Sequence, residues 1–235
     1  MGLYLVLLGV QGAGKGEQAK FIQTTYGIPQ VSTGDLFRAM KTRTDDFARK
    51  IQDIMAAGHL IDDDTTNQVV RERLAQPDAA NGVILDGYPR TPAQADWLEA
   101  HLASKGEKIT AVILFDLDYY TAFKRAFGRV SDSAGKTYNI YYNRDGIHTD
   151  EMELHPEKAY PPRLKVTLSS QEQAIRRPDD ADANAIIKRI DTFDKQTSPL
   201  IAYYEAKGLL KKVDANQPIE KVSIDLKAVI DAAKA

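Results

Sequence analysis

Short apolar runs alternate with longer amphipathic segments along most of the chain. Runs of strand length, each bounded by turn-forming or polar residues, occur at residues 3–8, 82–86, 109–117 and 209–213. Segments with helical periodicity lie between them and after them, at 15–26, 34–41, 47–57, 64–75, 91–104, 119–127, 183–206 and 219–233. Because strands and helices alternate, the pattern predicts an α/β fold with a mostly parallel sheet.

The alternation stops between about residues 130 and 176, where turn formers and tyrosines replace the helical period. A loop this long inside a compact domain is usually functional or partly independent. We interpret it as an inserted subdomain with a small β core, and the alternative is a disordered excursion. The expected core residues are Tyr138, Ile140, Tyr142, Leu164 and Val166.

The composition of the chain restricts the classes of molecule that it could bind. The chain has 235 residues, 31 Lys and Arg against 33 Asp and Glu, and a net charge of −2. No whole-molecule field would therefore attract nucleic acid or anionic lipid, and phosphate chemistry would need locally gathered cations. The absence of cysteine excludes disulfides and thiolate metal sites. The first apolar run is too short to span a bilayer, so we expect a soluble, cytoplasmic protein.

A glycine loop follows the first predicted strand. The segment GVQGAGK, residues 9–15, has the spacing of a P-loop and lies between a buried-type strand and a helix. Its glycines would let the backbone wrap a phosphate, while amide groups and Lys15 supply positive charge. A tight turn without a ligand would explain the glycines but not the lysine. Gly16 stands where a magnesium-binding Ser or Thr is usual, so a metal ion would need other ligands.

Three further segments carry arginines near predicted helix or strand ends. In STGDLFR (32–38), Arg38 follows Asp35 by one helical turn, and in LDGYPRT (85–91), Arg90 follows a buried strand that ends at Asp86. In FKRAFGRV (123–130), Arg125 and Arg129 share one helix face. Each segment also has a plainer interpretation: an N-cap before a solvated helix, a turn with a surface arginine, and a solvated helix end, respectively.

Four motifs occur in the order found in one family. The segments GVQGAGKGEQA (9–19), VSTGDLFRA (31–39), DGYPRTPAQA (86–95) and TSPLIAYYEAKGLL (197–210) together resemble adenylate kinase, a nucleoside monophosphate kinase. The resemblance runs from Leu3 to about Val222 and is weak in the middle insertion. It implies a P-loop parallel sheet wrapped by helices, with a core at 1–129 and 177–235, an AMP-binding module at 32–61 and a mobile lid at 130–176.

The resemblance also implies a site for each nucleotide. The ATP-binding residues would be Gly12, Ala13, Gly14, Lys15, Gly16, Glu17, Arg125, Arg129 and, through its main chain, Gln217. The AMP-binding residues would be Thr33, Arg38, Ile61, Gly87, Arg90, Gln94, Arg177 and Arg189, with Gln94 reading the adenine edge. The catalytic residues would be Lys15, Arg90, Arg129, Arg177 and Arg189. Asp35 and Asp86 would hold the waters of a Mg²⁺ ion.

The segment RRPDD (176–180) resembles the end of the family's lid, but Arg177 and Arg189 are one residue farther apart than expected. Either the extra residue is absorbed before the helix, or Arg176 or Lys188 takes one of these roles. Zinc bound by thiolates is excluded in this lid because cysteine is absent. We interpret His148 and His155 as solvated rather than metal-binding.

The implied reaction is reversible transfer of the ATP γ-phosphoryl group to AMP, giving two ADP. No catalytic base is required, since the AMP phosphate is already an anionic nucleophile, and the protein has to position and neutralise charge. The partners would be ATP, AMP and ADP, and the resemblance favours a monomer. Alternatives are a UMP/CMP kinase, a GTP-using kinase or a catalytically silent nucleotide sensor, although Thr33 and Gln94 favour AMP as acceptor.

Glu17 is the position least like the family, which usually has threonine there. A carboxylate pointing at a phosphate charge about 6 Å away would cost roughly 3 kcal/mol at an effective dielectric of 20. We favour an outward orientation, in which the acid gains a few tenths of a kcal/mol from the helix dipole. The alternative is that it pairs with a cation of the lid.

Tyr203 and Tyr204 are interpreted as packing residues.

Overall fold

The computed structural model describes residues 1–57, 61–142, 145–153, 163–168, 170, 172–176, 180 and 182–234, with the backbone alone at 148–153 and 163–167. The chain forms two compact units. The first unit comprises residues 1–9, 14–116 and 196–235, and the second comprises 10–13 and 117–195. None of the helices described is long and apolar enough to cross a membrane.

A five-stranded parallel sheet forms the centre of the first unit, in the order β2-β3-β1-β4-β9. The strands are β1 (Leu3–Leu8), β2 (Gln30–Ser32), β3 (Gly82–Asp86), β4 (Ala111–Asp116) and β9 (Leu210–Asp214). Four of them lie where the apolar runs predict strands. The short strand β2 was missed because three residues of mixed polarity give no apolar run.

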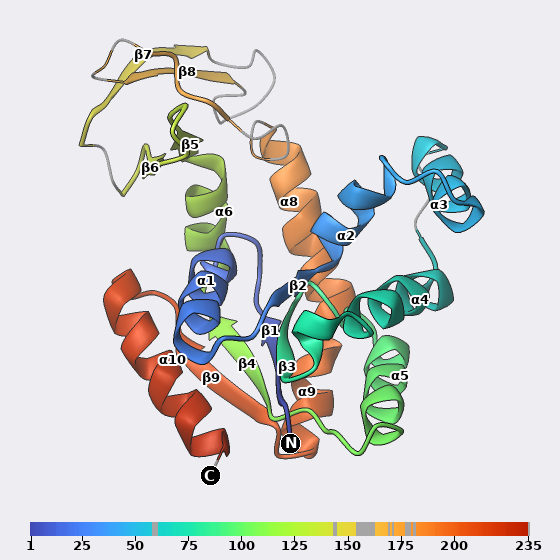
Figure 1. The fold of residues 1–235 in the computed structure, drawn as a ribbon. Helices are drawn as coiled ribbons and strands as arrows, with labels where there is room; N and C mark the ends of the chain where they lie inside the picture. The colour runs from blue at the N-terminus through green and yellow to red at the C-terminus, as the bar shows by residue number, and fades with distance from the viewer. Residues whose placement is uncertain are drawn as a thin grey trace. The chain divides into compact units, whose positions relative to one another are not determined.

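Helices cover both faces of this sheet (Figure 1). One face carries α1 (Lys15–Tyr26) and α10 (Ile219–Lys234), and the other carries α5 (Pro92–Ala103) and α9 (Pro199–Ala206). Alternate residues of a strand point to opposite faces. Tyr4, Val6 and Leu8 therefore pack in one cluster with side chains of α5, α9 and α4 (Asp63–Leu74).

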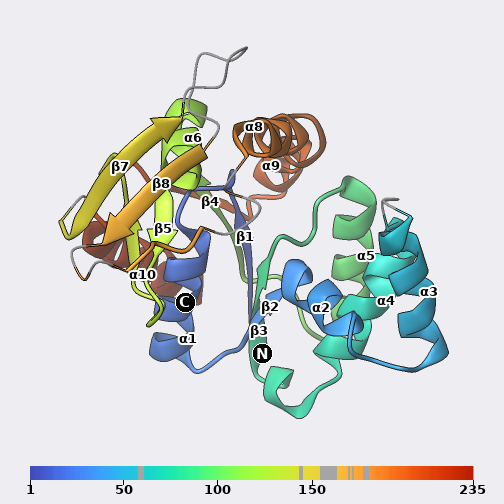
Figure 2. The same cartoon turned by 90° about the horizontal axis from the view of Figure 1, so that it is seen from above.

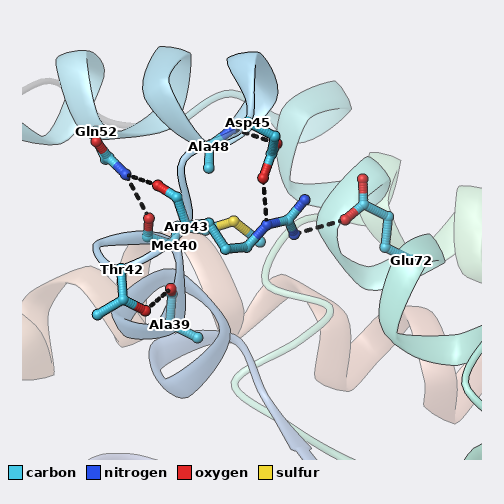
Figure 3. Close-up of polar contacts among 8 residues, drawn as sticks. All are labelled: Ala39, Met40, Thr42, Arg43, Asp45, Ala48, Gln52 and Glu72. Carbon is cyan, nitrogen blue, oxygen red and sulfur yellow. Dashed lines mark hydrogen bonds and ion pairs between the residues drawn. The ribbon is translucent and has the colours of Figure 1, made fainter.

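A smaller apolar cluster joins α2 (Thr33–Met40), α3 (Asp46–Ala56) and α4. The turn between α2 and α3 is held by polar contacts (Figure 3). Gln52 donates to the carbonyl oxygens of Met40 at 2.7 Å and Arg43 at 2.8 Å. Arg43 in turn donates to Asp45 at 2.8 Å and to Glu72 of α4 at 2.9 Å. These bonds tie the turn to α4.

The second unit contains α6 (Tyr119–Phe127), two antiparallel strand pairs and α8 (Ala183–Thr192). The pairs are β5 (Arg129–Ser131) with β6 (Thr137–Asn139), and β7 (Ile147–Glu153) with β8 (Arg163–Leu168). Figure 2 shows β7 and β8 running side by side in opposite directions. The insertion therefore forms strands where it is described, as a β subdomain requires.

Two sequence expectations need correction. The single helix predicted at 183–206 is divided into α8, a π-helical turn at Phe193–Thr197, and α9. Pro199 lacks a backbone N–H and is tolerated only in a first helical turn, so it starts a new helix.

Tyr142 is not part of a β core, because it lies in a turn after β6 with 51% of its surface exposed. Ile140 is buried, whereas the Leu164 and Val166 side chains lie outside the described residues.

Candidate functional site

The turn between β1 and α1 requires glycine at several positions. Gly9, Gly12 and Gly14 have φ values of 146°, 94° and 86°, a region that side-chain-bearing residues rarely adopt. A Cβ on Gly12 would also lie 2.4 Å from the carbonyl oxygen of Ala122. The backbone of this turn is therefore encoded by its glycines, and its course places residues 14–17 at the N-terminus of α1.

The N-terminus of α1 presents Lys15, Gly16 and Glu17. Lys15 Nζ donates to the carbonyl oxygen of Gly9 at 2.6 Å, which draws the ammonium group back over the turn. A Cβ on Gly16 would meet no atom within 4 Å, so packing does not require glycine there. The Glu17 carboxylate, 58% exposed, accepts from Lys20 at 3.0 Å. In this structure Glu17 is thus paired within its own helix.

A second set of predicted residues meets where β2 and β3 end. Thr33 is only 2% exposed, and its hydroxyl donates to the Gly87 carbonyl oxygen at 2.9 Å. Arg90 Nε donates to the same oxygen at 2.8 Å, and its Nη2 lies 3.4 Å from the Thr33 hydroxyl. Gly87 has a φ of 75°, and a Cβ there would crowd both side chains at 3.2 and 3.3 Å. The three residues therefore form one interdependent turn.

Gln94 lies beside this turn, in the first turn of α5, and is 5% exposed. Its Oε1 accepts from the Arg90 backbone N–H at 2.8 Å, and its Nε2 donates to Asp63 Oδ1 at 2.6 Å. Asp63 Oδ2 accepts from the Thr91 hydroxyl at 2.8 Å. Ile61, also predicted for this site, packs against the apolar cluster of α2, α3 and α4. Asp63 was not predicted, since it reads as one of three consecutive acids before a helix.

The two carboxylates predicted for magnesium occupy the same edge of the sheet. Asp86 is the last residue of β3 and is paired with Ser32 at the end of β2, and Asp35 follows in the first turn of α2. Asp86 accepts from Gln30 at 3.0 Å, and Asp35 forms an ion pair with Arg38. No group of three or more possible ligands gathers among the described residues. Carboxylate oxygens are ligands of the type that Mg²⁺ takes, alone or through its waters.

The predicted arginines of the second unit are organised by a buried carboxylate. Asp180 is 0% exposed and accepts from Arg129 Nε at 2.8 Å and Nη2 at 2.6 Å through one oxygen. Its other oxygen accepts from Gln11 Nε2 at 2.9 Å, and Gln11 Oε1 accepts from Arg189 at 3.0 Å. The glycine loop thus contributes Gln11 to a network that holds both arginines. Neither Gln11 nor Asp180 was predicted as a site residue.

Arg176, the alternative for a lid arginine, has a different environment. Its guanidinium donates to the backbone carbonyl oxygens of Phe127 and Asp180 and lies 4.7 Å from the Phe127 ring centre. Burial lowers its pKa, against the opposing effect of Asp180. These contacts are those of a side chain that packs the unit together. Arg177 lies outside the described residues, and Lys188 is exposed on α8.

Arg125 and Gln217 are the remaining predicted nucleotide-binding residues that the structure describes. Arg125 lies on α6 with its guanidinium 6.0 Å from the Tyr142 ring centre. Gln217 donates its side-chain amide to Asp225 at 2.6 Å. The side chain of His148 and the whole of His155 lie outside the described residues.

Known proteins are similar to this chain over nearly its whole length. The family model described as adenylate kinase matches residues 7–209. The adenylate kinase of Shouchella clausii is 38% identical over 232 residues, which cover 98% of this chain and 99% of that protein. That of Rhizobium etli is 40% identical over 226 residues (96% and 98%), and that of Nitrosococcus oceani 36% over 230 (97% and 99%).

These matches include the glycine loop, the turn around Thr33, Gly87 and Arg90, and the segment that holds Arg129 and Asp180. They extend through both compact units rather than through the P-loop alone. A shared nucleotide-binding loop on an otherwise different protein would not produce such coverage. The chain therefore belongs to the adenylate kinase family.

Proposed function

We propose that this chain catalyses reversible transfer of the γ-phosphoryl group of ATP to AMP, giving two ADP. The observation that carries the proposal is that two separate groups, each with a cationic side chain, lie at one edge of the sheet. Lys15 and the α1 N-terminus follow β1, and the turn of Thr33, Gly87 and Arg90 joins the ends of β2 and β3. Carboxyl ends of parallel strands are where α/β folds bind ligands.

In this reaction an oxygen of the AMP phosphate attacks the γ-phosphorus of ATP, and ADP leaves from the opposite side. Lys15 and the loop amides hold the donor phosphates. Arg38 and Arg90 hold the acceptor phosphate, and Arg129, Arg177 and Arg189 neutralise charge on the transferred group. Asp35 and Asp86 would hold a Mg²⁺ ion, which would supply positive charge to the donor phosphates.

The proposal includes boundaries for the moving parts. Residues 32–61 form the AMP-binding module, residues 130–176 form a lid, and the remainder forms the core. Closure of a lid excludes water, which would otherwise accept the phosphoryl group. Gly16 supports the donor site, because neither packing nor a positive φ requires glycine there, whereas close approach of a phosphate would.

The experiment is a coupled assay for ADP formation with ATP, Mg²⁺ and AMP, repeated with UMP, CMP and GMP as acceptors and with GTP as donor. We expect AMP-dependent ADP formation that falls by about 100-fold or more in Lys15→Met, by analogy with loss of one preorganised charge-stabilising group. Lys227→Met, which removes an exposed cation of α10 paired with Asp231, should leave the rate unchanged. Binding of both nucleotides without turnover would instead identify a nucleotide sensor.

A further inference from the structure

Two hydrogen bonds fix the orientation of the Gln94 side-chain amide. On one side it faces Asp63, whose carboxylate only accepts hydrogen bonds, and on the other it faces the backbone N–H of Arg90, which only donates. The distances are 2.6 Å to Asp63 Oδ1 and 2.8 Å to the Arg90 nitrogen. Turning the amide by 180° would set oxygen against oxygen and N–H against N–H. Both bonds would become repulsive in a side chain that is almost fully buried.

Asp63 is itself held in place. It lies in the first turn of α4, and its second carboxylate oxygen accepts from the Thr91 hydroxyl at 2.8 Å. The Thr91 oxygen in turn accepts from the Gln94 backbone N–H at 3.2 Å, which caps α5. The carboxylate therefore uses one oxygen to fix α5 and the other to fix the Gln94 amide. The bond to Gln94 involves a charged acceptor, so it is the stronger of the two that orient this amide.

A fixed amide presents a fixed pattern to a ligand. An amide nitrogen carries two N–H donors and an amide oxygen accepts two hydrogen bonds, so Gln94 retains one donor and one acceptor after its two bonds. Adenine complements this pair, because its N1 accepts and its 6-amino group donates. Hypoxanthine and guanine have the reverse pattern, with an N1–H donor and an O6 acceptor.

We propose that Asp63 determines the acceptor base by holding the Gln94 amide in the orientation that pairs with adenine and opposes 6-oxopurines. Asp63 acts through Gln94 and does not itself contact the nucleotide, so it is a positioning residue. The inference rests on the proposed acceptor site. It explains why that site would bind adenine and reject 6-oxopurines.

The test compares AMP with IMP, which has nearly the same shape and the reversed donor and acceptor pattern. In Asp63→Asn the neighbour of Gln94 is an amide that can donate or accept, so the Gln94 amide is free to turn at lower cost. We expect the ratio of kcat/KM for AMP to that for IMP to fall by about 10-fold or more, mainly through a gain with IMP. Asp63→Ser, whose hydroxyl also donates or accepts, serves if Asp63→Asn does not fold.

Thr91→Val is the matched control. It removes the other hydrogen bond of Asp63 and the side-chain cap of α5, but it leaves the contact between Asp63 and Gln94. We expect lower stability and an unchanged ratio of AMP to IMP. In a Gln94→Leu background, the Asp63 substitution should no longer change the AMP-to-IMP ratio of kcat/KM, because the side chain that contacts the base is absent.

The outcome that overturns the inference is an equal loss with AMP and IMP in Asp63→Asn, which would give Asp63 a structural role only. A wild-type protein that forms no ADP from ATP and AMP would overturn the proposed function instead. The inference would still be tested in that case, since titration calorimetry measures AMP and IMP binding to the wild type and to Asp63→Asn without turnover.

Discussion

At the scale of single residues, buried polar groups determine which side chains act together. Asp180 is fully buried and receives hydrogen bonds from Arg129 and Gln11, and through Gln11 it is linked to Arg189. A buried charge of this kind is costly unless its partners are complete. The network therefore fixes the positions of two proposed phosphate-binding arginines before a nucleotide arrives.

Asp180→Ala should remove this support. It leaves the Arg129 guanidinium, partly buried, without its carboxylate, and we expect the free energy of unfolding to fall by about 3 kcal/mol in urea titrations. We also expect kcat to fall, since Arg129 and Arg189 lose their fixed positions. Asp46→Asn removes an exposed ion pair with Arg49 and should change stability by less than about 0.5 kcal/mol. Equal effects of the two variants would contradict this account of Asp180.

The single tryptophan stacks on a half-buried histidine. Trp97 and His101 stack with ring centres 4.9 Å apart and planes at 7°, and His101 Nε2 is buried without a partner among the described residues. Burial, followed by the charges of Lys105 and Arg71, lowers the pKa of His101 below its ordinary value of 6.5. In the unfolded chain this histidine would titrate normally.

The stability contributed by neutral His101 should therefore be complete above about pH 6.5 and decrease as the pH falls towards the lowered pKa, because the unfolded state binds the proton first. Trp97 emission should titrate with a midpoint below pH 6.5, since a protonated imidazole quenches a stacked indole. Measuring emission and urea stability from pH 4.5 to 8 checks both. His101→Phe should abolish the emission change, and a midpoint at or above pH 6.5 would contradict the prediction.

At the scale of elements, the sequence predicts what periodicity and capping determine. Strands β1, β3 and β4 are mainly apolar runs, and β9 has only Leu210 and Val213 as apolar residues. Helices such as α5 begin at a capping residue followed by proline. Strand β2 was not predictable in this way, because its three residues become a strand by pairing with β3. The α8–α9 boundary was missed although the polar run at 194–198, followed by Pro199, interrupts the apolar period there.

The candidate site also contains residues of two kinds, those that belong to local sequence motifs and those placed by tertiary contacts. Lys15, Thr33, Arg90 and Gln94 belong to local motifs and could be found from the sequence, whereas Asp63, Gln11 and Asp180 owe their positions to tertiary contacts. Nothing in the order of residues links Gln11 to Asp180, which are 169 positions apart. Partners of this kind are visible only when the fold is known.

The α2–α3 turn offers a test at the element scale. Gln52 donates to the backbone carbonyl oxygens of Met40 and Arg43 and so ties the end of α2 to α3 (Figure 3). Gln52→Ala should lower the free energy of unfolding by about 1–2 kcal/mol and raise KM for AMP several-fold, with KM for ATP unchanged. The control is Gln68→Ala on the exposed face of α4, which should alter neither quantity. An equal rise in KM for ATP would show that the effect is not confined to the AMP-binding module.

At the scale of the whole molecule, the proposed phosphate-binding residues are divided between the two compact units. Lys15, Arg38 and Arg90 belong to the first, and Arg129 and Arg189 belong to the second. The net charge of −2 provides no general attraction for nucleotides, so binding depends on these local cations. Each unit should therefore respond to the ligand that its own cations hold.

Hydrogen exchange distinguishes these responses. AMP alone should protect amides of α2, α4 and α5 in the first unit, and addition of a non-hydrolysable ATP analogue with Mg²⁺ should further protect α6 and α8 in the second, because ligands stabilise the states that bind them. Arg189→Ala should weaken the protection of α8, since Arg189 contacts Gln11 of the glycine loop. Lys188→Ala, at the neighbouring exposed position, should not. If Lys188→Ala has the larger effect, the extra residue between Arg177 and Arg189 has moved the phosphate-binding role to Lys188, and the role proposed for Arg189 is wrong.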